Sequence, residues 1–167
     1  MRKITILGED GKVEIAVLGR RFPEEAGTWE GDWVHSTISL EIPGYSAHFE
    51  TDLRTNEFSD FLKQLKAMDA ELKGTAAMEP LESTVKITGV VHSLGEVSWD
   101  VETCYPLGTG AVLKFTLGAD QSYLPGLIKE LNELLEEFPV LEKQASKTDY
   151  LKNICRKIRQ SKNGNFK

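Results

Sequence analysis

Residues 33–68 read WVHSTISLEIPGYSAHFETDLRTNEFSDFLKQLKAM, and this stretch predicts a strand, a tight turn, a second strand and an amphipathic helix. Apolar and polar residues alternate on both sides of Pro43-Gly44, which is typical of antiparallel strands with one face in water. After Leu53 the apolar residues recur at helical spacing, at Phe58, Phe61, Leu62, Leu65 and Met68. The stretch therefore predicts a β-hairpin that leads into a helix with a core-facing stripe.

A second strand–helix unit, LKFTLGADQSYLPGLIKELNEL, follows at an offset of 66 residues. Without a gap, Phe49 aligns with Phe115, and the apolar stripes of the two helices coincide. The preceding strands fall out of phase, because Val101 on an apolar face aligns with His35 on a polar face. We expect a duplicated strand–helix arrangement, and the alignment leaves common ancestry open.

The remaining patterns complete an α+β fold with a mostly antiparallel sheet of about seven to eight strands and two long amphipathic helices. Asp10-Gly11 between two alternating runs predicts a hairpin, and residues 19–31 predict a long loop. We expect Thr55 or Asn56 to cap the first helix and Gly74 to end it. Ser122 is the expected cap of the second helix, rather than Asp120, because Pro125 is tolerated only in a first turn.

The charge divides the chain into an acidic body and a basic tail. Residues 144–167 hold seven Lys or Arg and one acid, a net +6, so with a total of −6 residues 1–143 carry −12. We expect 1–143 to form a single α+β domain and 144–167 a basic helical tail, with its helix over roughly 147–160. An acidic body disfavours nucleic acid as the partner and permits a basic protein.

Compartment and membrane signals are weak. The two cysteines, Cys104 and Cys155, form no CxxC pair, which suits a reducing compartment. The first residues contain only a short apolar run, and no stretch approaches the length of a membrane span. We expect a cytoplasmic protein that does not associate with a membrane.

The predicted loop before residue 33 contains the candidate partner-binding residues, because long ordered loops often carry function. It combines two aromatic residues with four acids: Phe22, Trp29, Glu24, Glu25, Glu30 and Asp32. The alternative is that Phe22 and Trp29 cover one end of the core. Charge reversal of the acids is expected to slow association with a basic partner.

No catalytic or cofactor-binding motif is recognisable. His35, His48 and Glu50 could meet on the wet face of a sheet and bind a metal, as in a small metal-dependent hydrolase, although exposed strand histidines are far commoner. Gly108-x-Gly110 lacks the third glycine of a dinucleotide loop. There is also no P-loop, GxSxG or HExxH sequence. We therefore expect a non-enzymatic protein without a cofactor or a bound metal.

Three groups of residues remain: Phe22-Pro23 with Trp29-x-Gly31-x-Trp33, then Pro43-Gly44-Tyr45, then Leu113-x-Phe115 with Asp120-Gln-x-Tyr-Leu-Pro125. Together they resemble the small bacterial Wap-type immunity proteins, over about residues 5–141 and without the tail. The resemblance implies a cytoplasmic protein that binds the C-terminal domain of a contact-dependent toxin, typically a nuclease. It implies protection by occlusion without chemistry, and it transfers no binding residues. The rival interpretation is a non-catalytic cytoplasmic binding or structural module.

Overall fold

The computed structural model describes residues 1–25 and 28–141, and these residues form two antiparallel four-stranded sheets and two helices. The first sheet has the order β1-β2-β3-β4, with strands Arg2–Leu7, Lys12–Arg20, Trp33–Ile42 and Tyr45–Arg54. The second has the order β5-β6-β7-β8, with strands Gly74–Met78, Val85–Val91, Glu96–Tyr105 and Ala111–Asp120. The α+β class and the expected number of strands are confirmed, and the predicted tail helix lies outside the described residues.

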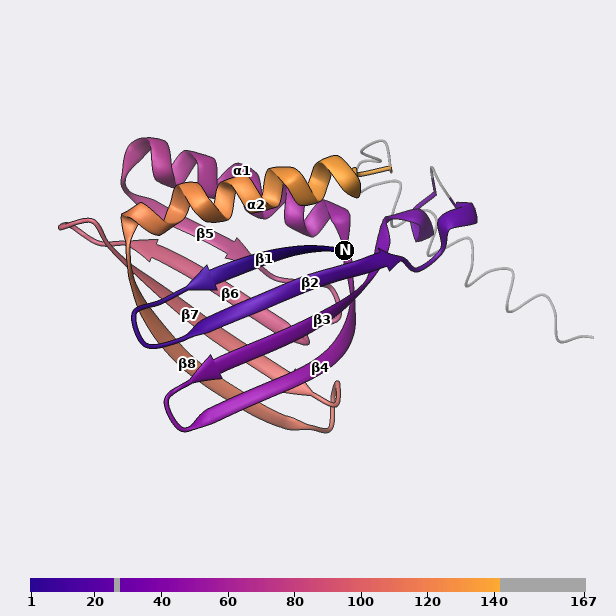
Figure 1. Ribbon diagram of the computed structural model, residues 1–167, viewed down its shortest axis with the longest axis horizontal. Helices are drawn as coiled ribbons and strands as arrows, with labels where there is room; N and C mark the ends of the chain where they lie inside the picture. Colours follow the sequence, from indigo (N-terminus) through magenta and orange to yellow (C-terminus); the bar gives the residue numbers. More distant parts are fainter. Residues whose placement is uncertain (26–27, 142–167) are drawn as a thin grey trace, which may run out of the picture.

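The two helices lie side by side along one border of the two sheets (Figure 1). Helix α1, Thr55–Glu71, follows β4 directly and packs on β5. Helix α2, Leu124–Glu137, follows β8 after one 3-10 turn, Gln121–Tyr123, and packs on β1. Neither helix is long and apolar enough to cross a membrane. The helices therefore cover the strands at which each sheet begins.

One apolar cluster joins both sheets and both helices. Alternate residues of each strand point into it because side chains alternate between the faces of a strand. Its largest fully buried members come from α1 and from both sheets: Trp99, Phe58, Phe61, Ile4, Ile6, Ile15, Ile38, Leu40, Leu53, Leu65, Met68 and Met78. The predicted stripe of α1 is thus part of the core, which removes this apolar surface from water.

Helix side chains also bond the outer edges of β1 and β5. The carboxylate of Glu130 in α2 accepts a 2.6 Å hydrogen bond from the backbone N–H of Thr5 in β1. Gln64 in α1 accepts a 3.0 Å bond from the Ala77 N–H in β5 and donates a 3.2 Å bond to the Ala77 carbonyl. Unpaired strand edges promote unwanted association, and these contacts protect two of the four edges.

Three local predictions are corrected by the structure. Thr55 does not cap α1, because its hydroxyl donates to Asp32, and the N–H of the cap residue Arg54 is bound instead by Glu57 at 2.9 Å. Asp120, not Ser122, caps the 3-10 turn before α2, accepting a 2.8 Å bond from the Ser122 N–H.

Helix α1 ends earlier than predicted, because Leu72 takes the left-handed conformation and Gly74 already begins β5. The predicted loop after β2 is present. It contains two 3-10 turns, Pro23–Glu25 and Glu30–Asp32.

Gly89 in β6 is required by the indole of Trp99 on the neighbouring strand. A β-carbon at Gly89 would lie 2.3 Å from Cζ3 of Trp99, which is only 2% exposed and cannot move aside. We expect Gly89→Ala to lower the free energy of unfolding by about 1–3 kcal/mol, as overpacked cores do. Urea unfolding would measure this. The control is Gly19→Ala in β2, where a β-carbon meets nothing within 4 Å; equal stability of the two variants would contradict the explanation.

Candidate functional site

The loop between β2 and β3 is held at its base by the carboxylate of Asp32, which is completely buried. Asp32 Oδ1 accepts a 2.8 Å bond from the Thr55 hydroxyl at the start of α1 and a 2.7 Å bond from the Leu141 N–H beyond α2. The guanidinium of Arg20 lies 3.8 Å from the same oxygen and donates a 2.6 Å bond to the Gly31 carbonyl. One buried carboxylate therefore ties the loop to β2, α1 and the segment after α2.

The aromatic residues of the loop pack around a second arginine, Arg54, at the end of β4. Trp29 and Trp33 meet edge to face, with ring centroids 5.5 Å apart and planes at 77°. The guanidinium of Arg54 lies 4.4 Å from the centroid of Trp29 and 5.8 Å from that of Trp33. A cation placed over an indole face is attracted by the negative face of the ring. The Trp-x-Gly-x-Trp pattern thus fixes the second half of the loop to the first sheet.

The outer part of the loop is acidic and partly aromatic. We call residues 21–25 and 28–31 the acidic loop. Phe22 is 41% exposed, and Glu24 and Glu25 are exposed on the first 3-10 turn. Trp29 and Glu30 are half-buried. Trp29 thus packs on the protein, whereas Phe22 faces outward, and a role of Phe22 in partner binding stays a prediction.

Asp32 does not belong to this exposed surface, and its prediction as a contact residue is corrected. A carboxylate is buried only where hydrogen bonds and a positive charge replace its water. Thr55, Leu141 and Arg20 supply these, and all three come from other parts of the fold. The sequence showed no sign of the anchoring roles of Arg20, Arg54 and Thr55, because their partners lie on other elements. The Trp29–Trp33 spacing was the only available signal.

The candidate metal ligands on the outer face of the first sheet do not come together as one group. His35 Nδ1 lies 3.1 Å from Asp52 Oδ1, and His35 Nε2 lies 3.5 Å from Glu50 Oε2. His48 turns instead to Ser39, with its Nδ1 2.8 Å from the hydroxyl oxygen. Within residues 1–25 and 28–141, no three His, Cys, Asp or Glu side chains are placed to hold a metal ion.

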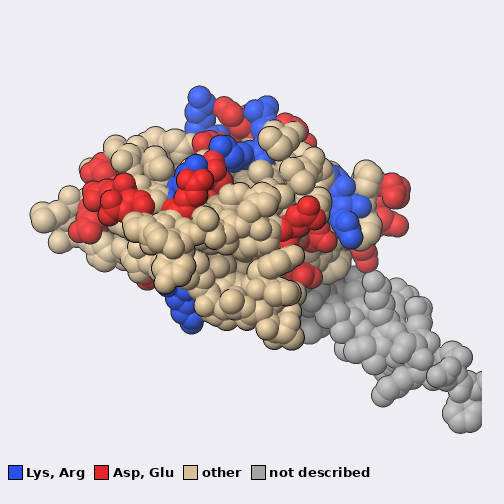
Figure 2. Space-filling model, turned by 60° about the horizontal axis from the view of Figure 1, so that its bottom comes forward, with Lys and Arg blue, Asp and Glu red and all other residues tan. Residues whose placement is uncertain are grey.

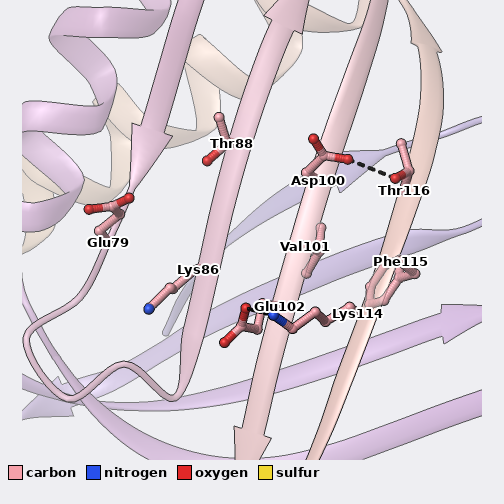
Figure 3. Close-up of a pocket in the computed structure, with 9 residues that line it drawn as sticks. All are labelled: Glu79, Lys86, Thr88, Asp100, Val101, Glu102, Lys114, Phe115 and Thr116. Atoms are coloured by element: carbon pink, nitrogen blue, oxygen red, sulfur yellow. Dashed lines mark hydrogen bonds and ion pairs between the residues drawn. The ribbon is translucent and has the colours of Figure 1, made fainter.

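The outer face of the second sheet has an open hollow of about 410 Å³ (Figure 3). Lys114 Nζ lies 2.7 Å from Glu102 Oε2, and this hydrogen bond lowers the pKa of Glu102. The Thr116 hydroxyl donates a 2.7 Å bond to Asp100. These contacts join neighbouring strands, as cross-strand polar pairs do. Three acids and two lysines line the hollow, so its charges nearly balance, unlike those of the acidic loop.

Comparison of the sequence with models of protein families identifies the family of this chain. The model of the immunity protein WapI-like family matches residues 5–139 of the 167 residues. The chain belongs to the WapI-like immunity protein family. The matched segment begins within β1 and ends at Pro139, so it contains both sheets, both helices and the acidic loop.

Two further comparisons add little to the WapI-like assignment. No curated protein matches this sequence significantly. Among solved structures, the chain is similar to one titled "Crystal structures of trypanosoma bruciei MRP1/MRP2". That likeness covers 81% of this chain and 83% of the other, with 11% identity and a TM-score of 0.45, and no property of the WapI-like protein follows from it.

Proposed function

We propose that this WapI-like protein neutralises a bacterial toxin domain by binding it through the acidic loop and occluding its active site. The family supports an immunity function. The observation that carries the choice of surface is the buried Asp32 anchor. It ties down the base of the loop that carries the exposed Phe22, Glu24 and Glu25. A loop ordered before binding loses less conformational entropy when the partner binds.

The partner we propose is a basic C-terminal toxin domain, most simply a nuclease. Enzymes that hold nucleic acid need clustered positive charge for their phosphate contacts. An acidic inhibitor that covers such a surface associates quickly, because opposite charges steer the encounter. Residues 1–143, with a net charge of −12, fit this partner and disfavour nucleic acid itself.

We further propose that the protein acts in the cytoplasm, away from membranes, without chemistry and without a cofactor. Occlusion requires only a complementary surface and slow dissociation. The acidic loop supplies an aromatic anchor in Phe22, and buried aromatic side chains dominate the binding energy of many interfaces. The charged rim formed by Glu24 and Glu25 would then act mainly on the association rate.

Charge reversal in the acidic loop tests the proposal. We expect Glu24→Lys/Glu25→Lys to slow association with the cognate toxin domain by about tenfold at low salt. The difference should shrink as salt screens the charges. Surface plasmon resonance measures the rates, and growth of bacteria that co-express the toxin domain reports protection.

The matched control is Asp69→Lys/Glu71→Lys at the end of α1, far from the loop in Figure 1. It changes the net charge equally, and positive charge at a helix C-terminus is well tolerated. Equal slowing by both variants would show that overall charge, not the loop, governs the encounter. Absence of binding and of growth protection by the unmodified protein would refute immunity and favour a binding or structural module of another kind.

We also infer that residues 1–143 form one domain in which the strand–helix arrangement is repeated. In support, β4 and β8 each have ten residues, and a helical turn begins at the next residue, Thr55 or Gln121. The preceding hairpin loops differ, with two residues at 43–44 and five at 106–110. The two loops differ in length by three residues, an odd number. Because side chains alternate between the two faces of a strand, this difference reverses which residues of the strand before the loop face the core in a gap-free alignment. This explains why Val101 aligns with the outward-facing His35.

A further inference from the structure

The outer edge of β8 differs from the edges that the helices protect. Glu130 and Gln64 bond the backbones of β1 and β5. Within residues 1–25 and 28–141, the outward backbone groups of β8 make one bond, near the C-terminal end of the strand. The Glu9 N–H of the β1–β2 turn donates a 2.8 Å bond to the Gly118 carbonyl. This contact shows that Gly118 directs its backbone groups away from β7.

The register then fixes which other backbone groups point outward. In an antiparallel strand, the N–H and C=O of one residue point to the same side, and successive residues alternate. The β7–β8 register is unbroken from Glu96–Asp120 to Tyr105–Ala111. Val112, Lys114 and Thr116 therefore share the outward direction of Gly118. No protein group in the described part of the chain bonds their backbone N–H or C=O groups.

The side chains along this edge are also poorly suited to repel another strand. Val112 is 53% exposed, Thr116 is neutral, and Lys114, the single charge, is already paired with Glu102. The other uncovered edge, β4, carries two acids on its outer face, Glu50 and Asp52. Figure 2 looks toward the side where β4 and β8 lie in Figure 1, and it shows a broad uncharged area with both acidic and basic residues around it. Edges with few charges accept additional strands more readily than highly charged edges do.

We propose that β8 is a second contact surface, at which Val112–Thr116 pairs with an extended, basic-flanked strand of a protein partner. The added strand would continue the second sheet by main-chain hydrogen bonds, as in β-strand addition. The identity of the partner as the toxin rests on the proposed function, whereas the geometry of the edge does not.

The charges around the edge select the flanking residues of the incoming strand. Glu9 and Asp10 line the hollow beside Phe115–Gly118 at one end of the edge. Asp100, Glu102 and Glu79 line the neighbouring hollow of the second sheet together with Lys86 and Lys114, which leaves an excess of one negative charge there (Figure 3). Lysine or arginine on either side of the pairing segment would therefore meet carboxylates, while flanking acids would be repelled.

A second copy of this chain is the less suitable occupant. When two copies pair through β8 in antiparallel orientation, the outward backbone groups of Val112, Lys114 and Thr116 can all find partners only in the register centred on Lys114. That register places Lys114 opposite its own symmetry mate, and like charges directly opposite each other destabilise a strand pair. The edge therefore fits a different chain better than its own copy.

The test uses the full-length protein and an alternating peptide, acetyl-KTVTVTK-amide. Solvent exchange of backbone amides is followed by NMR with the peptide at about 1 mM, a concentration that detects weak association. With the peptide at about twice its dissociation constant, exchange of the Val112, Lys114 and Thr116 amides is expected to slow about threefold. The amides of β4 should be unaffected.

Two control peptides and two protein variants make the result specific. A peptide N-methylated at alternate residues cannot form the ladder, and acetyl-ETVTVTE-amide has the wrong flanking charges, so neither should protect these amides. Val112→Pro removes a backbone N–H that points away from β7 and pairs with no strand of the protein. Edge strands tolerate proline at such a position, and the loss of this donor should weaken peptide binding about fivefold. Val112→Thr keeps that N–H and should bind as the unmodified protein does.

The outcomes separate this inference from the immunity function. The proposal of a β8 contact surface would be overturned if the peptide did not slow exchange of the β8 amides. It would also be overturned if all three peptides slowed exchange equally, or if the β4 amides were protected instead. Exchange that slows with protein concentration alone would assign the edge to a second copy and also overturn the proposal. Toxin neutralisation without β8 protection would leave the proposed function standing. Protection by the peptide without toxin neutralisation would support the β8 contact surface but not the proposed immunity function.

Discussion

Replacing Asp32 with alanine is expected to lower the free energy of unfolding by about 3–5 kcal/mol, the usual cost of breaking a buried charged network. The variant leaves the Thr55 hydroxyl and the Leu141 N–H without their acceptor. It also removes the carboxylate beside Arg20, whose side chain is only 14% exposed. Burial already lowers the pKa of Arg20, and the charge of Asp32 opposes that effect. Urea unfolding followed by circular dichroism would measure the loss.

Two comparison variants test whether the loss of stability comes from the buried, charged carboxylate of Asp32. Asp32→Asn keeps an acceptor oxygen but loses the charge, so we expect an intermediate loss of stability. Asp100→Ala removes an exposed carboxylate with one hydrogen bond to Thr116, and should cost less than about 1 kcal/mol. If Asp32→Ala were no more destabilising than Asp100→Ala, Asp32 would not be the anchor of the acidic loop.

Replacing Phe61 with alanine is expected to cost about 3–5 kcal/mol, as for other fully buried phenylalanines. Phe61 projects from α1 and has no exposed surface. Its ring meets Trp99 of β7 edge to face, with centroids 6.3 Å apart and planes at 71°. The substitution would leave a cavity between a helix and the second sheet. The midpoint of urea unfolding should fall accordingly.

Phe22→Ala is the matched control, because it makes the same chemical change on the surface. With a side chain 41% exposed, we expect it to alter stability by no more than about 0.5 kcal/mol. Its effect should appear instead in binding, as a dissociation rate from the toxin domain raised about thirtyfold if Phe22 is a hot spot. A stable Phe61→Ala protein would contradict the core assignment. Unchanged dissociation of Phe22→Ala would remove Phe22 from the interface.

The regular elements could be predicted because their signals are local. Alternation identified the strands around Pro43-Gly44, and helical spacing identified the stripe of Phe58, Phe61 and Leu65. The candidate loop was also found, from its length and composition. Helix ends were predicted poorly, because a cap depends on which partner reaches it. The Thr55 hydroxyl was expected to turn back to its own helix, yet it donates its hydrogen bond to the nearby carboxylate of Asp32.

The candidate site shows the same limit more clearly. An aspartate in a run of acids has the composition of a solvated surface, and only its contacts with Thr55, Leu141 and Arg20 reveal that Asp32 is internal. The stacking of Arg54 on Trp29 joins residues that are 25 positions apart. No periodic pattern encodes such pairs, because each depends on how the sheets and helices have already packed.

The amino-acid sequence by itself determined which segments are strands and helices, which faces are apolar, and where acid and aromatic residues gather. These properties follow from the geometry of a single element and its exposure to water. The tertiary structure alone decided that Asp32 anchors the acidic loop while Phe22 remains outside. It also decided that the helices cover β1 and β5, while in the described part of the chain the outward backbone groups of Val112, Lys114 and Thr116 in β8 have no partner. Both outcomes depend on contacts between distant elements, and those contacts exist only once the sheets and helices have packed together.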